Sequence, residues 1–146
     1  MNAADDNAEH RDASRYLISA PETATLVRDA LRAGKNDLAV RMLTEAVARL
    51  IEVGASDLPG SMLTEPETTG DHRYDVVLAT EWLYALNLTG VEAPAWTGVN
   101  PLDGDEWLWG GGGFESSEYR DLVRQDTPEE FLRVGVLTRR RDWVNA

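Results

Sequence analysis

The chain has 146 residues and an apolar fraction of 42%, which suits one globular domain with a core of its own. It contains no cysteine, which excludes disulfides and thiolate chemistry, and no apolar run approaches the roughly 20 residues that span a bilayer. The formal net charge of −12 disfavours duplex nucleic acid as a partner, because that affinity comes mainly from Lys and Arg that neutralise phosphates. The acidity either keeps the protein soluble or steers in a basic protein partner, and both interpretations stay open.

The N-terminal segment is polar and acidic. Residues 1–12 carry four acidic side chains and no apolar pattern, which predicts a disordered acidic tail. They do not resemble a secretory signal, so we expect a cytoplasmic protein. We expect residues 13–146 to form a single helical domain, with subdomains at 13–54 and 65–146 if the loop between them is a boundary. A short helix is expected over residues 13–18.

Two helices are predicted next, and a short turn joins them. Pro21 suits the first position of a helix, which carries an apolar stripe and ends at Gly34. Asn36 is the predicted N-cap of the following helix, which has one continuous apolar face and ends at Gly54. Since only a few residues separate the two helices, we expect them to pack as a hairpin.

The next predicted helix is the most apolar segment of the chain. A loop over residues 55–70 precedes it, Asp71 is its predicted N-cap, and it runs to Gly90. It has almost no polar face, which is typical of a central, buried helix. Glu81 lies within it, and desolvation there would raise its pKa as a general acid needs. We favour instead a structural pairing of Glu81 with an arginine or with a backbone amide of the Gly-rich loop.

The last third of the chain predicts short helices. Ser117 is the predicted N-cap of one, and Thr127 is the predicted N-cap of another, which ends at Gly135. Residues 134–137 form a short extended run, and Thr138 is expected to cap a final helical turn. Strand-like segments are too few to build a sheet, so we predict an all-α fold. It is a small helical bundle with a long, buried central helix and a Gly/Trp-rich loop.

Residue types that bind metals or phosphate do not occur at telling spacings. The two histidines, His10 and His72, have no second histidine or cysteine at ligand spacing, so no metal site is predicted. The glycines at 110–113 lack the Gly-Lys-Ser/Thr ending of a phosphate-binding loop. No second group at a telling spacing supports catalysis at Glu81. We therefore predict no cofactor and no enzymatic activity.

Three short motifs occur in a fixed order along the chain. They are Gly70-Asp71-x-Arg73-Tyr74-Asp75, Pro94-Ala95-Trp96 and Phe131-x-x-x-Gly135. In this order they resemble the helical C-terminal domain of actinobacterial antitoxin or regulator proteins, which are encoded beside nucleotidyltransferase-like toxins. The resemblance covers most of the chain after Thr25. It implies a cognate toxin as the partner, and it implies that Trp96 is a structural pin at the exit of the central helix.

These observations predict a non-catalytic, antitoxin-like or regulatory protein that binds and neutralises a basic protein partner. A transcriptional regulator that binds DNA through the N-terminal helical pair is the alternative. Whether the chain forms a homo-oligomer is left open. We place the partner contacts in the Gly/Trp-rich loop, because interfaces favour Trp and a Gly-rich tether lets a loop adapt. The candidate partner-binding residues are Asp103, Asp105, Glu106, Trp107, Trp109 and Phe114.

The tryptophans of this region also suit a core. We expect Trp96, which follows a proline, to lie in the core. Trp107 and Trp109 stand two residues apart, and we expect one to point inward and the other outward if the segment is extended. Which of the two is exposed is left open.

Overall fold

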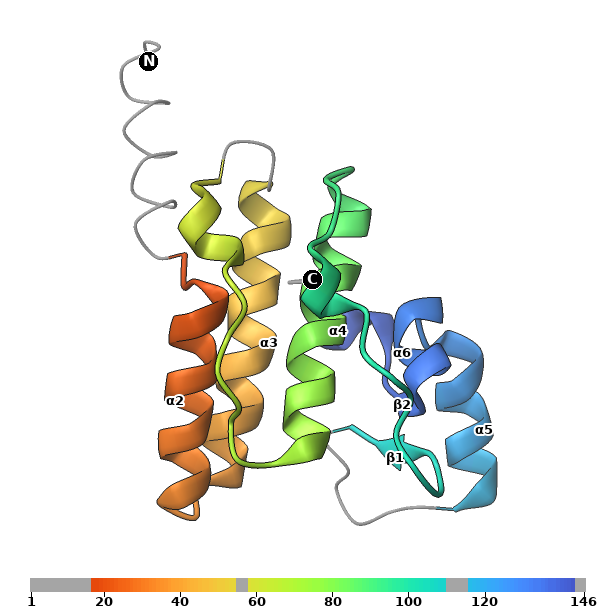
Figure 1. The fold of residues 1–146 in the computed structure, drawn as a ribbon. Helices are drawn as coiled ribbons and strands as arrows, with labels where there is room; N and C mark the ends of the chain where they lie inside the picture. The colour runs from red at the N-terminus through yellow and green to blue at the C-terminus, as the bar shows by residue number, and fades with distance from the viewer. Residues whose placement is uncertain (1–16, 55–57, 110–115, 144–146) are drawn as a thin grey trace, which may run out of the picture.

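Three helices lie side by side, and two shorter helices pack on the far side of the third (Figure 1). This computed structural model describes residues 17–54, 58–109 and 116–143. The predicted all-α fold is confirmed, and no helix within these ranges has the length and apolarity to cross a bilayer. The helices are α2 (Ala20–Arg32), α3 (Asn36–Val53), α4 (His72–Leu88), α5 (Ser117–Asp126) and α6 (Glu129–Val134), with short 3-10 turns η1 (Gly60–Leu63), η2 (Ala95–Thr97) and η3 (Arg140–Asp142).

Parts of the predicted N-terminal organisation lie outside the described residues. The acidic tail expected at 1–12 is one of them, and the helix expected at 13–18 is largely another. Leu17 and Ile18, which are described, are not helical. Residues 55–57 of the predicted loop are also outside, and the rest of that loop contains η1, which the sequence did not predict.

Helices α2 and α3 form the predicted hairpin because their facing sides carry small or branched apolar residues. Ala20 and Val27 on α2 are fully buried, as are Leu43 and Val47 on α3. Such side chains let two helices approach closely and pack without voids. Ser19 caps α2, since its Oγ accepts a hydrogen bond from the Glu22 amide at 3.1 Å.

Four predicted N-caps are wrong, each by a single residue. Asn36 is the first residue of α3, and Lys35 before it makes no capping hydrogen bond through its side chain. Ser116, rather than Ser117, caps α5 through a bond from the Tyr119 amide. Thr127 caps no helix start, because its hydroxyl instead donates to the Val123 carbonyl and accepts from the Thr138 amide. The residue that precedes η3 is Arg139 rather than Thr138. Local sequence predicts where these helices start but leaves the capping residue undecided between neighbours.

Helix α4 is central and buried, as predicted. Asp71 caps it, and its Oδ1 accepts hydrogen bonds from the Arg73 amide at 2.9 Å and the Tyr74 amide at 3.4 Å. The helix contacts α2, α3, α6 and η2. A single core cluster therefore contains Leu43 from the hairpin together with Trp82 from α4.

A two-stranded parallel sheet, which the sequence did not predict, holds the loop after α4. It pairs β1 (Trp107–Leu108) with β2 (Val136–Leu137). Gly135 ends α6 with a φ of +84°, a left-handed conformation that suits glycine, and turns the chain into β2. The Trp107 amide donates to the Gly135 carbonyl and the Trp109 amide to the Leu137 carbonyl, both at 2.9 Å. These bonds fix the backbone of Trp107 and Trp109 against β2 and so set how deeply each indole is buried.

Candidate functional site

A row of aromatic rings runs from the core to the surface beside β1. Phe131 stacks on Trp143 with ring centroids 4.8 Å apart, and Trp143 stacks on Trp109 at 5.6 Å. Tyr74 then meets the edges of Trp109 at 5.9 Å and of Trp107 at 5.7 Å. Because each ring is in contact with the next, the outermost indole has a fixed orientation.

Trp107 and Trp109 lie on the same face of their segment, so the expectation that they point to opposite sides is wrong. Their rings contact each other edge to face at 5.5 Å. In an extended segment, residues two apart share a face, and the intervening Leu108 lies on the other side with Val123 and Leu137. Trp109 is only 6% exposed, whereas Trp107 is half-buried. Depth along the aromatic row, rather than direction, separates the two indoles.

Trp107 lines an open hollow of about 640 Å³ between α3, the start of α4 and β1. We call it the Trp107 hollow. The guanidinium of Arg73 lies over the Trp107 ring, with 4.8 Å between Cζ and the centroid. Burial raises the pKa of the Tyr74 hydroxyl, and the nearby carboxylate of Asp71 raises it further. The residues that line the Trp107 hollow include Asp37, Arg41, Asp71, Arg73, Tyr74 and Trp107.

The first of the three sequence motifs, Gly70-Asp71-x-Arg73-Tyr74-Asp75, builds one wall of the Trp107 hollow. Gly70, with a φ of +89°, turns the chain into the Asp71 cap. Asp75 accepts hydrogen bonds from the Thr69 amide at 2.7 Å and from the Thr69 hydroxyl at 2.6 Å. The first turn of α4 is therefore held by Asp71 and Asp75 together, which fixes the positions of the Arg73 and Tyr74 side chains beside the hollow.

The predicted acidic residues of this region do not share one environment. Asp103 and Asp105 are exposed in the segment that leads to β1. Glu106 is half-buried and paired with Arg124 of α5, whose Nε donates to Oε1 at 3.0 Å. The backbone carbonyl of Glu106 also accepts a hydrogen bond from Arg120. Glu106 thus fastens β1 to α5, while Asp103 and Asp105 keep their carboxylates towards solvent.

Two further aromatic residues named by the sequence lie elsewhere. Phe114 is outside the described residues. Trp96, expected in the core, is half-buried and packs against the edge of the core cluster. Its indole N–H donates to the Leu63 carbonyl at 2.9 Å, which ties η2 to η1. Trp96 therefore joins the exit of α4 to the loop that precedes α4.

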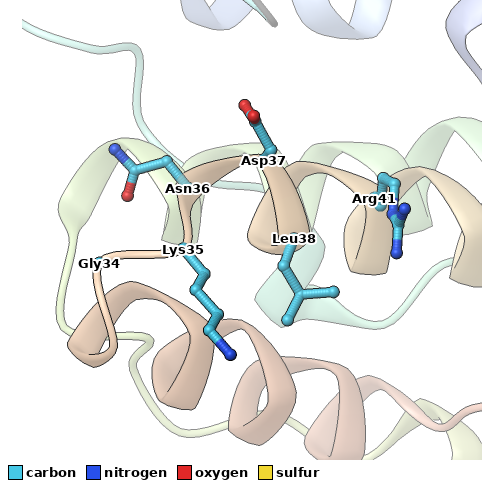
Figure 2. Close-up of a pocket in the computed structure, with 6 residues that line it drawn as sticks. All are labelled: Gly34, Lys35, Asn36, Asp37, Leu38 and Arg41. Atoms are coloured by element: carbon cyan, nitrogen blue, oxygen red, sulfur yellow. The ribbon is translucent and has the colours of Figure 1, made fainter.

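Another hollow, of about 440 Å³, lies at the turn between α2 and α3 (Figure 2). Lys35 and Leu38 extend to one side of this turn and Asp37 to the opposite side (Figure 2). Asp37 and Arg41 line this hollow and the Trp107 hollow, so the two are neighbours across the first turn of α3. The sequence analysis missed these residues, because a charged residue just after a turn looks like any solvated side chain.

Neither charge nor geometry of the helical pair favours the DNA-binding alternative. The two helices lie side by side (Figure 1), whereas the helices of a helix-turn-helix cross steeply. Acidic and basic side chains are equal in number along residues 20–53, so this pair carries no net positive charge to attract DNA. The basic residues are Arg28, Arg32, Lys35, Arg41 and Arg49, and the acidic ones are Glu22, Asp29, Asp37, Glu45 and Glu52.

Glu81 is desolvated as the sequence predicts, but the predicted pairing of its carboxylate is not found among the described residues. It is fully buried, and neither carboxylate oxygen has a hydrogen-bond partner. No described arginine pairs with it, and the predicted amide belongs to the Gly-rich loop at 110–113, which lies outside the described residues. Burial alone raises the pKa of its carboxyl well above the ordinary value. A carboxyl with no exposed surface is also out of reach of a substrate in this conformation.

Within the described ranges, no three His, Cys, Asp or Glu side chains gather where they could hold a metal ion. Comparison of the chain with protein-family models, curated proteins and solved structures finds no match. Function is therefore inferred from the residues and hollows themselves.

Proposed function

We propose that this chain is a non-catalytic, antitoxin-like or regulatory protein that binds a basic protein partner at the Trp107 hollow. The observation that carries the proposal is the setting of Trp107. Its half-buried indole lies on the wall of an open hollow and is held by Tyr74, Trp109 and Arg73. A rigid aromatic ring loses little conformational freedom on contact, which is why such rings anchor protein interfaces.

The charges near Trp107 support a basic partner. Asp37 and Asp71 line the hollow, and Asp103 and Asp105 lie exposed in the segment that enters β1. Two basic residues, Arg41 and Arg73, line the hollow as well, and the guanidinium of Arg73 lies over the Trp107 ring. The whole chain carries a net charge of −12, which would steer a basic partner towards it from a distance.

The environment of the carboxyl groups supports a role without catalysis. A general acid or base has to reach the reacting atom within hydrogen-bond distance. Glu81 has no exposed surface, and Glu106 is held by Arg124. Asp105 is exposed in the segment that enters β1.

Co-expression with the product of the adjacent gene tests the proposal. The chain should relieve the growth defect that this product causes and should co-purify with it as a stable complex. Trp107→Ala should weaken the complex at least tenfold, because loss of a central aromatic anchor costs about 2 kcal/mol or more. Isothermal titration calorimetry measures the affinity, and growth curves measure the relief.

Trp96→Ala is the matched control, since it removes an equally half-buried indole that lies outside the Trp107 hollow. It should leave the affinity within about twofold if the variant remains folded, which circular dichroism checks. A complex that survives Trp107→Ala unchanged would contradict the proposed site. A neighbouring product that neither binds the chain nor loses its toxicity would contradict the function.

A further inference from the structure

A second hollow, of about 330 Å³, adjoins the Trp107 hollow. We call it the Tyr119 hollow, and Tyr119, Thr44, Thr138, Arg139 and Arg141 line it. Val40 and Leu108 line both hollows, so the two meet across these apolar side chains. An extended segment that lies over Trp107 can therefore continue across Val40 and Leu108 into the Tyr119 hollow.

The Tyr119 hollow has a net positive lining, with two arginines and one aspartate, whereas acidic and basic residues are equal in number in the Trp107 hollow. Arg139 and Arg141 line the Tyr119 hollow, and neither forms an ion pair with any described residue. Asp142 also lines the hollow, but its Oδ2 already accepts from the Thr138 hydroxyl at 2.8 Å and the Arg139 amide at 3.0 Å.

Arg139 is positioned to receive an anion. Its Cζ lies 5.3 Å from the centroid of the Tyr119 ring. A guanidinium held over a ring keeps N–H donors free for a carboxylate, which it can bind through two parallel hydrogen bonds. The intervening Arg140 is different, because its Nε lies 3.9 Å from Oδ1 of Asp126 and its backbone amide bonds to Oδ2 at 3.2 Å. Arg139 and Arg141 thus line the hollow, whereas Arg140 between them does not.

We infer that the Tyr119 hollow binds a carboxylate side chain of the same partner segment whose basic part lies at the Trp107 hollow. The inference rests on the proposed function for the source of that carboxylate. The partner segment then carries opposite charges at its two ends and binds in one direction only. A carboxylate fits better than a nucleic acid, because a net charge of −12 repels a long polyanion but hardly affects a single acidic side chain.

An NMR titration of the isotope-labelled full chain with an acetylated, amidated Glu-Glu-Leu-Glu peptide tests the inference. The peptide should shift the amide signals of Tyr119, Thr138 and Arg139 in a saturable manner, and high salt should weaken the effect. Arg139→Gln combined with Arg141→Gln should raise the dissociation constant about tenfold, the order expected when two partly exposed ion pairs are lost.

Arg140→Gln is the matched control, because it removes the same charge from a neighbouring side chain that does not line the hollow. It should change the dissociation constant less than about twofold. The inference is overturned if the peptide shifts none of these signals, or if Arg140→Gln weakens binding as much as the double variant. It is also overturned if a short oligothymidylate binds the same signals more tightly than the peptide.

These outcomes are separable from a failure of the proposed function. Trp107→Ala should leave binding of the acidic peptide unchanged, because its indole does not line the Tyr119 hollow. Peptide binding with no complex between the chain and the adjacent gene product would leave the anion site standing and remove the proposed partner. A Trp107-dependent complex without peptide binding would do the reverse.

Discussion

The α2–α3 hairpin and the part of the described structure from α4 to Trp143 fill the same core with different side chains. We call this second part the aromatic half. The hairpin contributes mostly small or branched residues, such as Ala24 and Val47, whereas the other half contributes Trp82, Phe131 and Trp143. Small side chains let helices approach closely, but they are too short to reach from the core to the surface. A row of aromatic rings in contact can reach from the core to the surface, and here the row continues to Trp107. The candidate site lies where the core itself reaches the solvent.

The largest expected effect tests whether the aromatic half holds the fold together. Trp143→Ala should lower the free energy of unfolding by about 3–5 kcal/mol, as is usual for truncation of a fully buried aromatic residue. Trp143 lies between Phe131 and Trp109, so its loss also removes two ring contacts. Urea denaturation followed by far-ultraviolet circular dichroism measures the change.

Trp143→Phe is the control for that prediction. It keeps an aromatic ring in the stack but removes the indole N–H that donates to the Thr138 hydroxyl at 3.0 Å. The loss should stay near 1–3 kcal/mol, made up of roughly one hydrogen bond and some packing. Equal losses in both variants would mean that the hydrogen bond, rather than the stack, stabilises this half.

The next effect concerns Glu81, on the helix that the two regions share. Its pKa is raised in the folded state by burial, so folding favours the protonated carboxyl. Its contribution to stability is therefore fully present below the pKa of the unfolded chain and is lost as the pH rises through that of the folded state. Within this window the free energy of unfolding should fall by about 1.4 kcal/mol for each pH unit. Urea denaturation at a series of pH values measures this slope.

Glu81→Gln isolates that slope from other titrating groups. The variant keeps the size of the side chain but does not ionise, so the difference from the natural chain should grow with pH across the window and then level off. If the free energies of unfolding of the variant and of the natural chain change in parallel from acid to neutral pH, Glu81 has a partner or contact with solvent in solution. In that event the core at α4 would be less dry than the hairpin beside it.

The smallest effect tests the hairpin alone. Ser19→Ala removes the hydroxyl that accepts from the Glu22 amide at the start of α2. Loss of such a cap costs about 1 kcal/mol, with a range of 0.5–2. The melting temperature should fall by a few degrees, while the signals of the Trp107 indole should stay in place. A shift of those signals would mean that the hairpin and the aromatic row are more tightly coupled than their packing suggests.

Much of the fold is predictable from local sequence. Periodic apolar residues and Gly stops predict the positions of α2, α3 and α4, and Asp71 as the cap of α4. The same reasoning misplaces caps where two adjacent residues both accept hydrogen bonds, as at Ser116 and Ser117. The predicted site residues are brought only partly together, since Trp107 opens into a hollow, Trp109 is buried and Glu106 is held by Arg124.

By itself, the sequence determined the helical class, the buried central helix and the acidic surface, because periodicity and charge are local properties of a chain. Only the tertiary structure decided the sheet between β1 and β2, the unpartnered state of Glu81 and the different depths of the two indoles. These features depend on which distant residues meet, as when Trp107 pairs with Val136. The two adjoining hollows arise in the same way, since α3, α4, β1 and η3 all contribute to their walls.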